Sequence, residues 1–135
     1  MRAIPLLFTA AALAGCTTQP PSPSEAAEAQ ATLAELTAGK VAGAPITCLP
    51  PTVRSRNMVV IDRSTIAFED GRNRTYINHL RGACDIQPGF NSLVVRSGGS
   101  GTCSGDIADV ADLRTGMTYG SCALGEFVPY TRAGG

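Results

Sequence analysis

The feature that most constrains this chain is an apolar run near its start that is too short to cross a membrane. One basic residue, Arg2, precedes the run, which covers residues 4–14. A charged start, about 7–15 apolar residues and then small residues are typical of a secretory signal. A helix that spans a bilayer needs about 20 apolar residues. We therefore expect residues 1–15 to be a cleaved signal peptide and the remainder to fold after export.

The motif that ends this segment is Leu13-Ala14-Gly15-Cys16. It resembles the lipobox of bacterial lipoproteins, in which a diacylglycerol thioether forms on the cysteine and a peptidase cuts before it. The resemblance implies that Cys16 is the lipidation site and that acyl chains anchor the protein to a membrane. By the sorting rule of such lipoproteins, Thr17 favours the outer membrane, on its periplasmic side. An ordinary signal peptide with a chance cysteine is the alternative.

Residues 16–45 are expected to separate the anchor from the folded domain. The stretch 17–24 is rich in proline and serine, which predicts an extended tether. Residues 24–38 predict a short helix, because serines near its start can cap it and Gly39 can end it. Its apolar residues are few and mostly alanine, which favours a partly ordered stalk helix over a helix docked on the domain.

Four cysteines remain once Cys16 is assigned to lipid. They are Cys48, Cys84, Cys103 and Cys122. Export places them in an oxidising compartment, so we expect two disulfides. No pair has the C-x2-C spacing of zinc or redox sites, and the chain has one histidine, so we expect no metal site and no cofactor.

The pairing of these cysteines depends on the strands that carry them. If residues 102–110 and 117–124 form a hairpin, Cys103 and Cys122 lie opposite each other, which leaves Cys48 for Cys84. The nested set, Cys48–Cys122 with Cys84–Cys103, is a rival, and sequence alone does not choose among the three possible pairings.

Residues 46–132 are expected to form an all-β domain, a small antiparallel β-barrel or sandwich of about six strands. Short runs of β-formers alternate with turn residues throughout this range. The runs are 57–62, 65–69, 74–80, 92–96, 102–110 and 117–124, with a further short strand at 126–130.

The best-defined turn signal is Asp70-Gly71-Arg72-Asn73. A four-residue loop at 70–73 would place Glu69 opposite Arg74 and pair their charges. This register also predicts one shared apolar face. Its members would be Ile66, Phe68, Ile77 and His79.

Four segments of the domain carry a further resemblance: Cys48-Leu49-Pro50, Asn78-His79-Leu80 with Gly82 and Cys84, Cys103-Ser104-Gly105-Asp106, and residues 122–127. They resemble a family of small, uncharacterised lipoproteins of Gram-negative bacteria. The family has no assigned activity, so the resemblance implies no mechanism.

The candidate binding residues are His79, Arg81 and Asp106. His79 is the only imidazole, and it could act as a general base or ligand, or it could lie at the mouth of the barrel and hydrogen-bond a carbonyl. Ser104 and Asp106 invite a Ser-His-Asp hypothesis, but the glycines around Ser104 do not match a nucleophile elbow. We therefore expect Gly105 to permit a bulge and Asp106 to accept from a backbone amide, and we assign no catalytic residue.

The charge of residues 46–132 is nearly balanced, with nine arginines, no lysine and eight acidic residues. This balance argues against a nucleic-acid partner, which favours a basic face. We expect a non-enzymatic, lipid-anchored module that faces the periplasm and binds a protein or another envelope component. The alternative is a small enzyme or ligand-binding β-barrel that uses His79 with Asp106 or Arg81.

Overall fold

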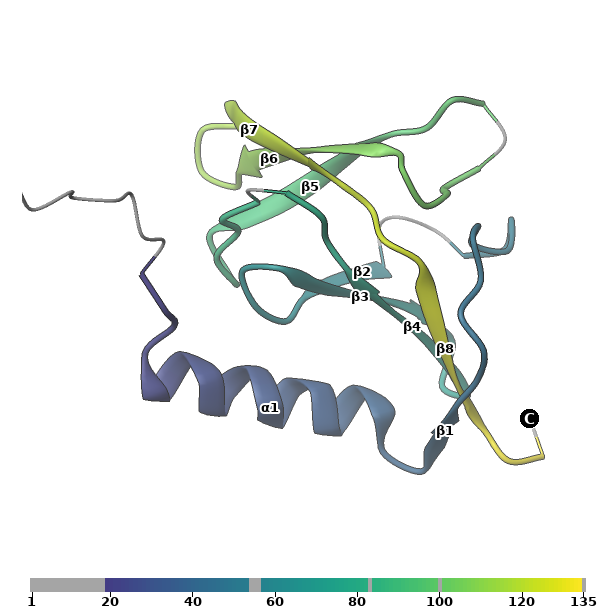
Figure 1. The fold of residues 1–135 in the computed structure, drawn as a ribbon. Coiled ribbons are helices and arrows are strands. Elements are labelled where there is room, and N and C mark those ends of the chain that lie inside the picture. Colours follow the sequence, from purple (N-terminus) through teal and green to yellow (C-terminus); the bar gives the residue numbers. More distant parts are fainter. Residues whose placement is uncertain (1–18, 54–56, 83, 100, 135) are drawn as a thin grey trace, which may run out of the picture.

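The computed structural model describes residues 19–53, 57–82, 84–99 and 101–134. The expected signal peptide and Cys16 lie outside these residues. The described chain forms one helix, α1 (Pro23–Thr37), and eight strands (Figure 1). The strands are β1 (Lys40–Ala42), β2 (Met58–Val60), β3 (Thr65–Asp70), β4 (Arg74–His79), β5 (Asn91–Arg96), β6 (Ile107–Asp112), β7 (Thr118–Ala123) and β8 (Phe127–Arg132).

The strands form two antiparallel sheets that pack face to face as a sandwich. The five-stranded sheet has the order β1-β8-β4-β3-β2, and the three-stranded sheet has the order β5-β6-β7. β7 and β8 follow each other along the chain and pass from one sheet to the other, as the yellow-green ribbon in Figure 1 shows. The all-β prediction is confirmed, and of its two forms the structure is the sandwich and not the closed barrel.

The main core fills the space between the two sheets. β3 and β4 contribute Ile66, Phe68 and Tyr76, and the three-stranded sheet contributes Leu93 and Val110 from the opposite side. Phe68 also meets Phe127 edge to face, with ring centroids 5.9 Å apart, an arrangement that aromatic pairs prefer. Side chains of both sheets therefore bury one another, as in other sandwiches.

The β3–β4 hairpin has a register one residue away from the predicted one. Asp70 pairs with Arg74 and Ile66 with Asn78, so the turn contains only residues 71–73. Gly71 makes this tighter turn possible because it adopts a φ of +65°, which is costly for residues with a Cβ. A slip of one residue moves side chains to the other face of a sheet. Ile66 and Phe68 therefore face the core, whereas Ile77 and His79 lie on the opposite face.

α1 packs against this opposite face and is not a free stalk. Ala29, Leu33 and Leu36 contact a second apolar cluster that contains Ala67 and Ile77. The helix begins with a capping box: the Ser22 hydroxyl accepts from the Glu25 N–H at 3.2 Å, and the Glu25 carboxylate accepts from the Ser22 N–H at 2.7 Å. The prediction of a stalk was wrong because the apolar face, although thin, finds a matching apolar sheet face.

The folded unit begins before residue 46, where we had placed its start. β1 adds an edge strand to the sheet, and Lys40 pairs with Arg132 of β8. The ammonium group of Lys40 also donates to the Leu36 carbonyl and the Thr75 hydroxyl, each at 2.7 Å. A strand of three residues gives almost no sequence pattern, which is why β1 was missed.

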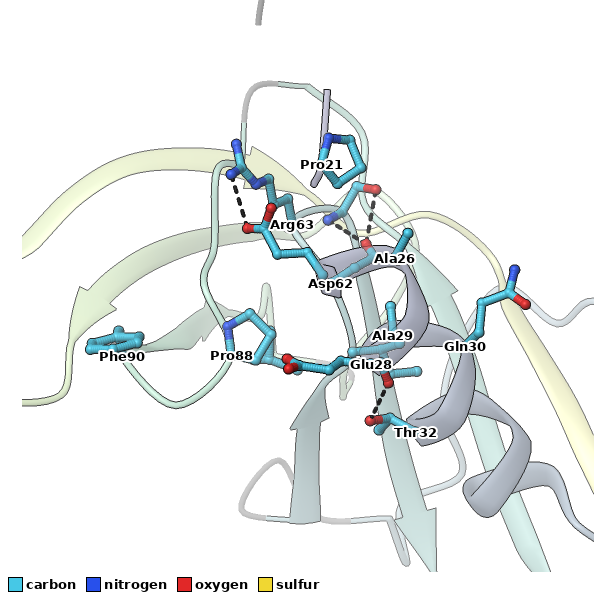
Figure 2. Close-up of a pocket in the computed structure, with 14 residues that line it drawn as sticks. Pro21, Ala26, Glu28, Ala29, Gln30, Thr32, Asp62, Arg63, Pro88 and Phe90 are labelled. Carbon is cyan, nitrogen blue, oxygen red and sulfur yellow. Dashed lines mark hydrogen bonds and ion pairs between the residues drawn. The ribbon is translucent and has the colours of Figure 1, made fainter. Parts of the chain in front are cut away.

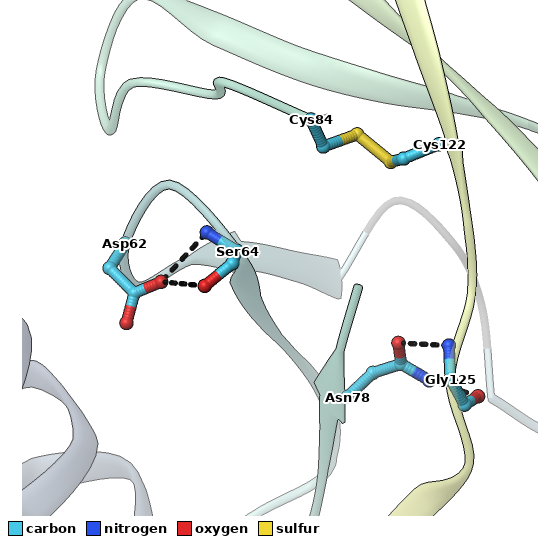
Figure 3. The surroundings of a disulfide bond; sticks show 6 residues. All are labelled: Asp62, Ser64, Asn78, Cys84, Cys122 and Gly125. Carbon is cyan, nitrogen blue, oxygen red and sulfur yellow. Dashed lines mark hydrogen bonds between the residues drawn. A yellow bond between two sulfur atoms is a disulfide. The ribbon is translucent and has the colours of Figure 1, made fainter. Parts of the chain in front are cut away.

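The two expected disulfides are present, but their pairing is neither of the two that we considered. Cys48 pairs with Cys103, with Cα atoms 4.0 Å apart, and Cys84 pairs with Cys122, with Cα atoms 5.2 Å apart (Figure 3). The predicted hairpin is present as β6 and β7, but β6 begins at Ile107, so Cys103 lies before the strand and Ala108 stands opposite Cys122. Cys122 faces the core from β7, where Cys84 meets it.

A buried side-chain amide stabilises the segment in which the chain passes from β7 in one sheet to β8 in the other. Asn78 is fully buried; its Nδ2 donates to the Gly125 carbonyl at 2.7 Å and its Oδ1 accepts from the Gly125 N–H at 3.0 Å (Figure 3). A Cβ at position 125 would collide with the carbonyl oxygen of His79. Glycine is therefore required where β7 gives way to β8.

Candidate binding groove

Two of the three predicted site residues come together. His79 and Arg81 line a shallow hollow of about 310 Å³ with Glu126. His79 is exposed, and its Nδ1 lies 3.3 Å from the Thr65 hydroxyl oxygen. Among the described residues, no carboxylate forms a hydrogen bond or ion pair with His79. His79 thus bonds a neighbouring group, as in the non-catalytic interpretation, but its partner is a hydroxyl and not the expected carbonyl.

Asp106 has the structural role that the sequence predicted for it. Its Oδ2 accepts from the backbone N–H of Cys103 at 2.8 Å, and Gly105 adopts a φ of +92° beside it. This carboxylate thus holds the turn next to the Cys48–Cys103 disulfide. Asp106 is not among the residues that line the hollow of His79 and Arg81.

A larger groove, of about 530 Å³, lies between α1 and the sheet (Figure 2). One wall is the N-terminal half of α1, and the other consists of residues 60–64 together with Pro88 and Phe90. Apolar groups line much of the groove, among them Ala26, Ala29, Ile61, Pro88 and Phe90. Concave apolar surface with a few convergent polar groups is typical of ligand sites.

Arg63 supplies the main polar group at the rim of the groove. Its guanidinium lies 3.1 Å from a Glu25 oxygen and 3.5 Å from an Asp85 oxygen, so it connects α1, the β2–β3 turn and the segment before β5. The Nε atom of Arg63 is buried and has no hydrogen-bond partner among the described residues. An unpaired buried donor is costly, and this one lies in a partly exposed side chain whose guanidinium stands at the rim of the groove.

The electrostatics of the rim keep these groups charged. Hydrogen bonds from the Ser22 backbone and hydroxyl, with that from Arg63, lower the pKa of Glu25 from 4.5 to about 2. The Glu25 carboxylate in turn raises the pKa of Arg63. The groove therefore combines an apolar wall with a fixed ion pair. Within the described part of the chain, no group of three or more metal-ligating side chains occurs.

Comparison with known proteins provides no relative for this chain. No family model, no curated protein and no solved structure matches it. In the described residues, no helix is long and apolar enough to cross a membrane. The resemblance to small lipoproteins therefore stays a prediction.

Sequence reasoning missed the groove because the groove exists only when α1 is docked. The local signal was present: Ser22 and Glu25 stand three residues apart, as in a capping box. Nothing in the sequence, however, connects Glu25 to Arg63 across 38 positions. Only the packing of the helix on the sheet brings these two residues together.

Proposed function

We propose that the protein is a lipid-anchored module of the cell envelope that binds a protein or another envelope component. The observation that carries the proposal is the groove between α1 and the sheet, with its apolar walls and the buried, unpaired Nε of Arg63. A partner that buries an apolar group between Ala26 and Phe90 and offers an acceptor to Arg63 would match this surface.

An anchor on Cys16 would restrict where the groove can lie. Only six peptide units join Cys16 to Ser22, the N-cap of α1. Fully extended, such a segment spans at most about 22 Å. Since α1 is docked on the sheet, lipid on Cys16 would hold the groove close to the bilayer and limit how far the domain can turn.

A photocrosslinking amino acid at Ala26 tests the proposal in intact cells. Ala26 lines the groove and is exposed, whereas its neighbour Ala27 is also exposed but does not line the groove. We expect the Ala26 probe to capture one discrete envelope component and the Ala27 probe to capture none. Equal capture from both positions, or no discrete product from Ala26, would contradict a binding role for the groove.

The anchor is tested separately with Cys16→Ser. The wild-type protein should incorporate labelled palmitate and sediment with membranes, whereas the Cys16→Ser variant should do neither. If the unchanged chain carries no acyl group, the anchored part of the proposal fails, and the crosslinking result still decides the binding part.

The second candidate function is a small-ligand or catalytic site at the hollow that His79 shares with Arg81 and Glu126. Because the chain has one histidine, its ring signals in an NMR spectrum report this hollow alone. Specific shifts on adding a small anion such as inorganic phosphate, absent in Arg81→Gln, would favour this candidate. Unchanged signals would count against it.

A further inference from the structure

Three large apolar side chains are exposed together at one end of the sandwich. Phe90, Leu113 and Met117 expose 63%, 58% and 70% of their surfaces, respectively. The Leu113 N–H donates to the Phe90 carbonyl at 3.0 Å, and Met117 belongs to the same β6–β7 turn as Leu113. We call these three residues the apolar tip. Single exposed apolar residues are ordinary on protein surfaces, but adjacent ones indicate a contact surface.

Several hydrogen bonds hold the β6–β7 turn in one conformation. One oxygen of Asp112 accepts from the N–H groups of Arg114 and Thr115, each at 2.8 Å, and the Asp112 N–H donates to the Met117 carbonyl at 2.9 Å. These hydrogen bonds hold Leu113 and Met117 in a fixed position.

The apolar tip lies at the same end of the molecule as the start of α1. Phe90 lines the groove together with Pro21, and Figure 1 shows the β6–β7 turn, the start of β5 and the start of the helix on one side. Cys16 is five residues before Pro21, a distance of at most about 18 Å along an extended chain. A bilayer that holds lipid on Cys16 would therefore lie on the side of the molecule that carries the tip.

We propose that the apolar tip is a membrane-contact surface, which inserts into the headgroup and outer acyl region of the bilayer that carries the anchor. This inference rests on the proposed lipidation of Cys16. Arg114 stands between Leu113 and Met117 and is exposed, so its guanidinium can remain among the lipid phosphates. The acyl anchor and the apolar tip together attach the protein to the bilayer at two points. Two points of attachment fix the orientation of the groove relative to the membrane.

Single tryptophans test the contact directly, because the chain contains no tryptophan of its own. Leu113→Trp and Met117→Trp place the probe in the tip. Val41→Trp is the control: Val41 is 69% exposed, but it lies on β1, beyond the far end of α1. Each full-length, lipidated variant is reconstituted into phosphatidylcholine vesicles whose acyl chains are brominated, since bromine quenches tryptophan on contact.

We expect the emission of both tip probes to shift to the blue and to fall about twofold or more, because interfacial side chains lie roughly 5–10 Å deep. The Val41→Trp emission should not change. Flotation of the same samples reports the anchor, and melting temperatures confirm that each variant is folded.

The possible outcomes distinguish failure of the anchor from failure of the membrane contact. A protein that does not float with the vesicles overturns the anchor and the membrane contact together. A protein that floats but leaves both tip probes unquenched overturns the membrane contact alone. A blue shift that appears without bromine quenching and grows with protein concentration assigns the tip to contact between two copies, and it also overturns the inference.

Discussion

The two sheets of the sandwich differ in how many of their faces are covered. The five-stranded sheet packs on the main core with one face and on α1 with the other. The three-stranded sheet packs with one face only, and its outer face exposes Val94 and Ile107 beside the Arg96–Asp109 ion pair. The covered sheet is therefore the frame that holds the helix, and the other sheet carries the tip.

The burial pattern along the strands reflects this difference. In β3 the first four residues, and in β4 the middle four, are all buried. β5 and β6 begin by alternating buried with more exposed positions. Continuous burial is expected for a strand covered on both faces, and alternation for a strand with one face in water.

The largest expected effect comes from the core of the covered sheet. Phe68→Ala removes a fully buried ring that packs on Phe127 and should lower the free energy of unfolding by about 3–5 kcal/mol. Val94→Ala, on the open face, should change it by less than about 0.5 kcal/mol. Denaturant unfolding measures both. Similar losses for the two variants would show that the open face is covered after all.

Removal of one disulfide should have an effect of intermediate size, and it should affect one sheet more than the other. Replacing Cys84 and Cys122 together by alanine should cost about 2–4 kcal/mol, because the crosslink restricts the unfolded chain. This bond ties β7 to the segment after β4, so hydrogen exchange should quicken mainly in β5, β6 and β7. The matched double replacement of Cys48 and Cys103 is the control. Equal loss of protection in β3 and β4 would contradict the division between the sheets.

The smallest effect concerns the helix that covers the five-stranded sheet. The pKa of Glu25 is lowered to about 2 by the Ser22 hydrogen bonds and by Arg63, so its contribution to stability is complete above pH 4.5 or so. This contribution should be lost as the pH falls from about 4.5 to about 2. Carboxyl NMR titration measures the pKa, and helical circular dichroism follows the helix over the same range.

Two replacements serve as controls for this titration. Glu25→Gln should abolish the Glu25 step, whereas Glu28→Gln, on the same wall of the groove, should leave it in place. A Glu25 pKa near 4.5 in the unchanged protein would mean that the capping box and the Arg63 contact do not form in solution.

Much of the fold was predictable because strands and turns depend on local pattern. The predicted runs at 65–69, 74–80 and 92–96 agree with β3, β4 and β5 within about one residue at each end. The β3–β4 turn was located correctly, but its length was wrong by one residue, which moved His79 from the core face to the helix side. The turn conformation of Gly71 decides this register, and residue type alone does not specify it.

The candidate site was less predictable because it depends on contacts between distant segments. His79 and Arg81 do share a hollow, but Asp106, whose carboxylate accepts from the Cys103 amide, does not line it. The groove joins Glu25 to Arg63, and the disulfides join residues 55 and 38 positions apart. Such pairs become neighbours only after both sheets have formed.

By itself, the sequence determined the class of fold, the presence of two disulfides and the structural role of Asp106, since alternation, cysteine number and turn chemistry are local properties. The tertiary structure alone decided which cysteines pair, that α1 docks and where the groove and the apolar tip lie. Each of these depends on which faces of distant elements meet, and burial of a thin apolar face on α1 becomes favourable only when the facing sheet surface is complete.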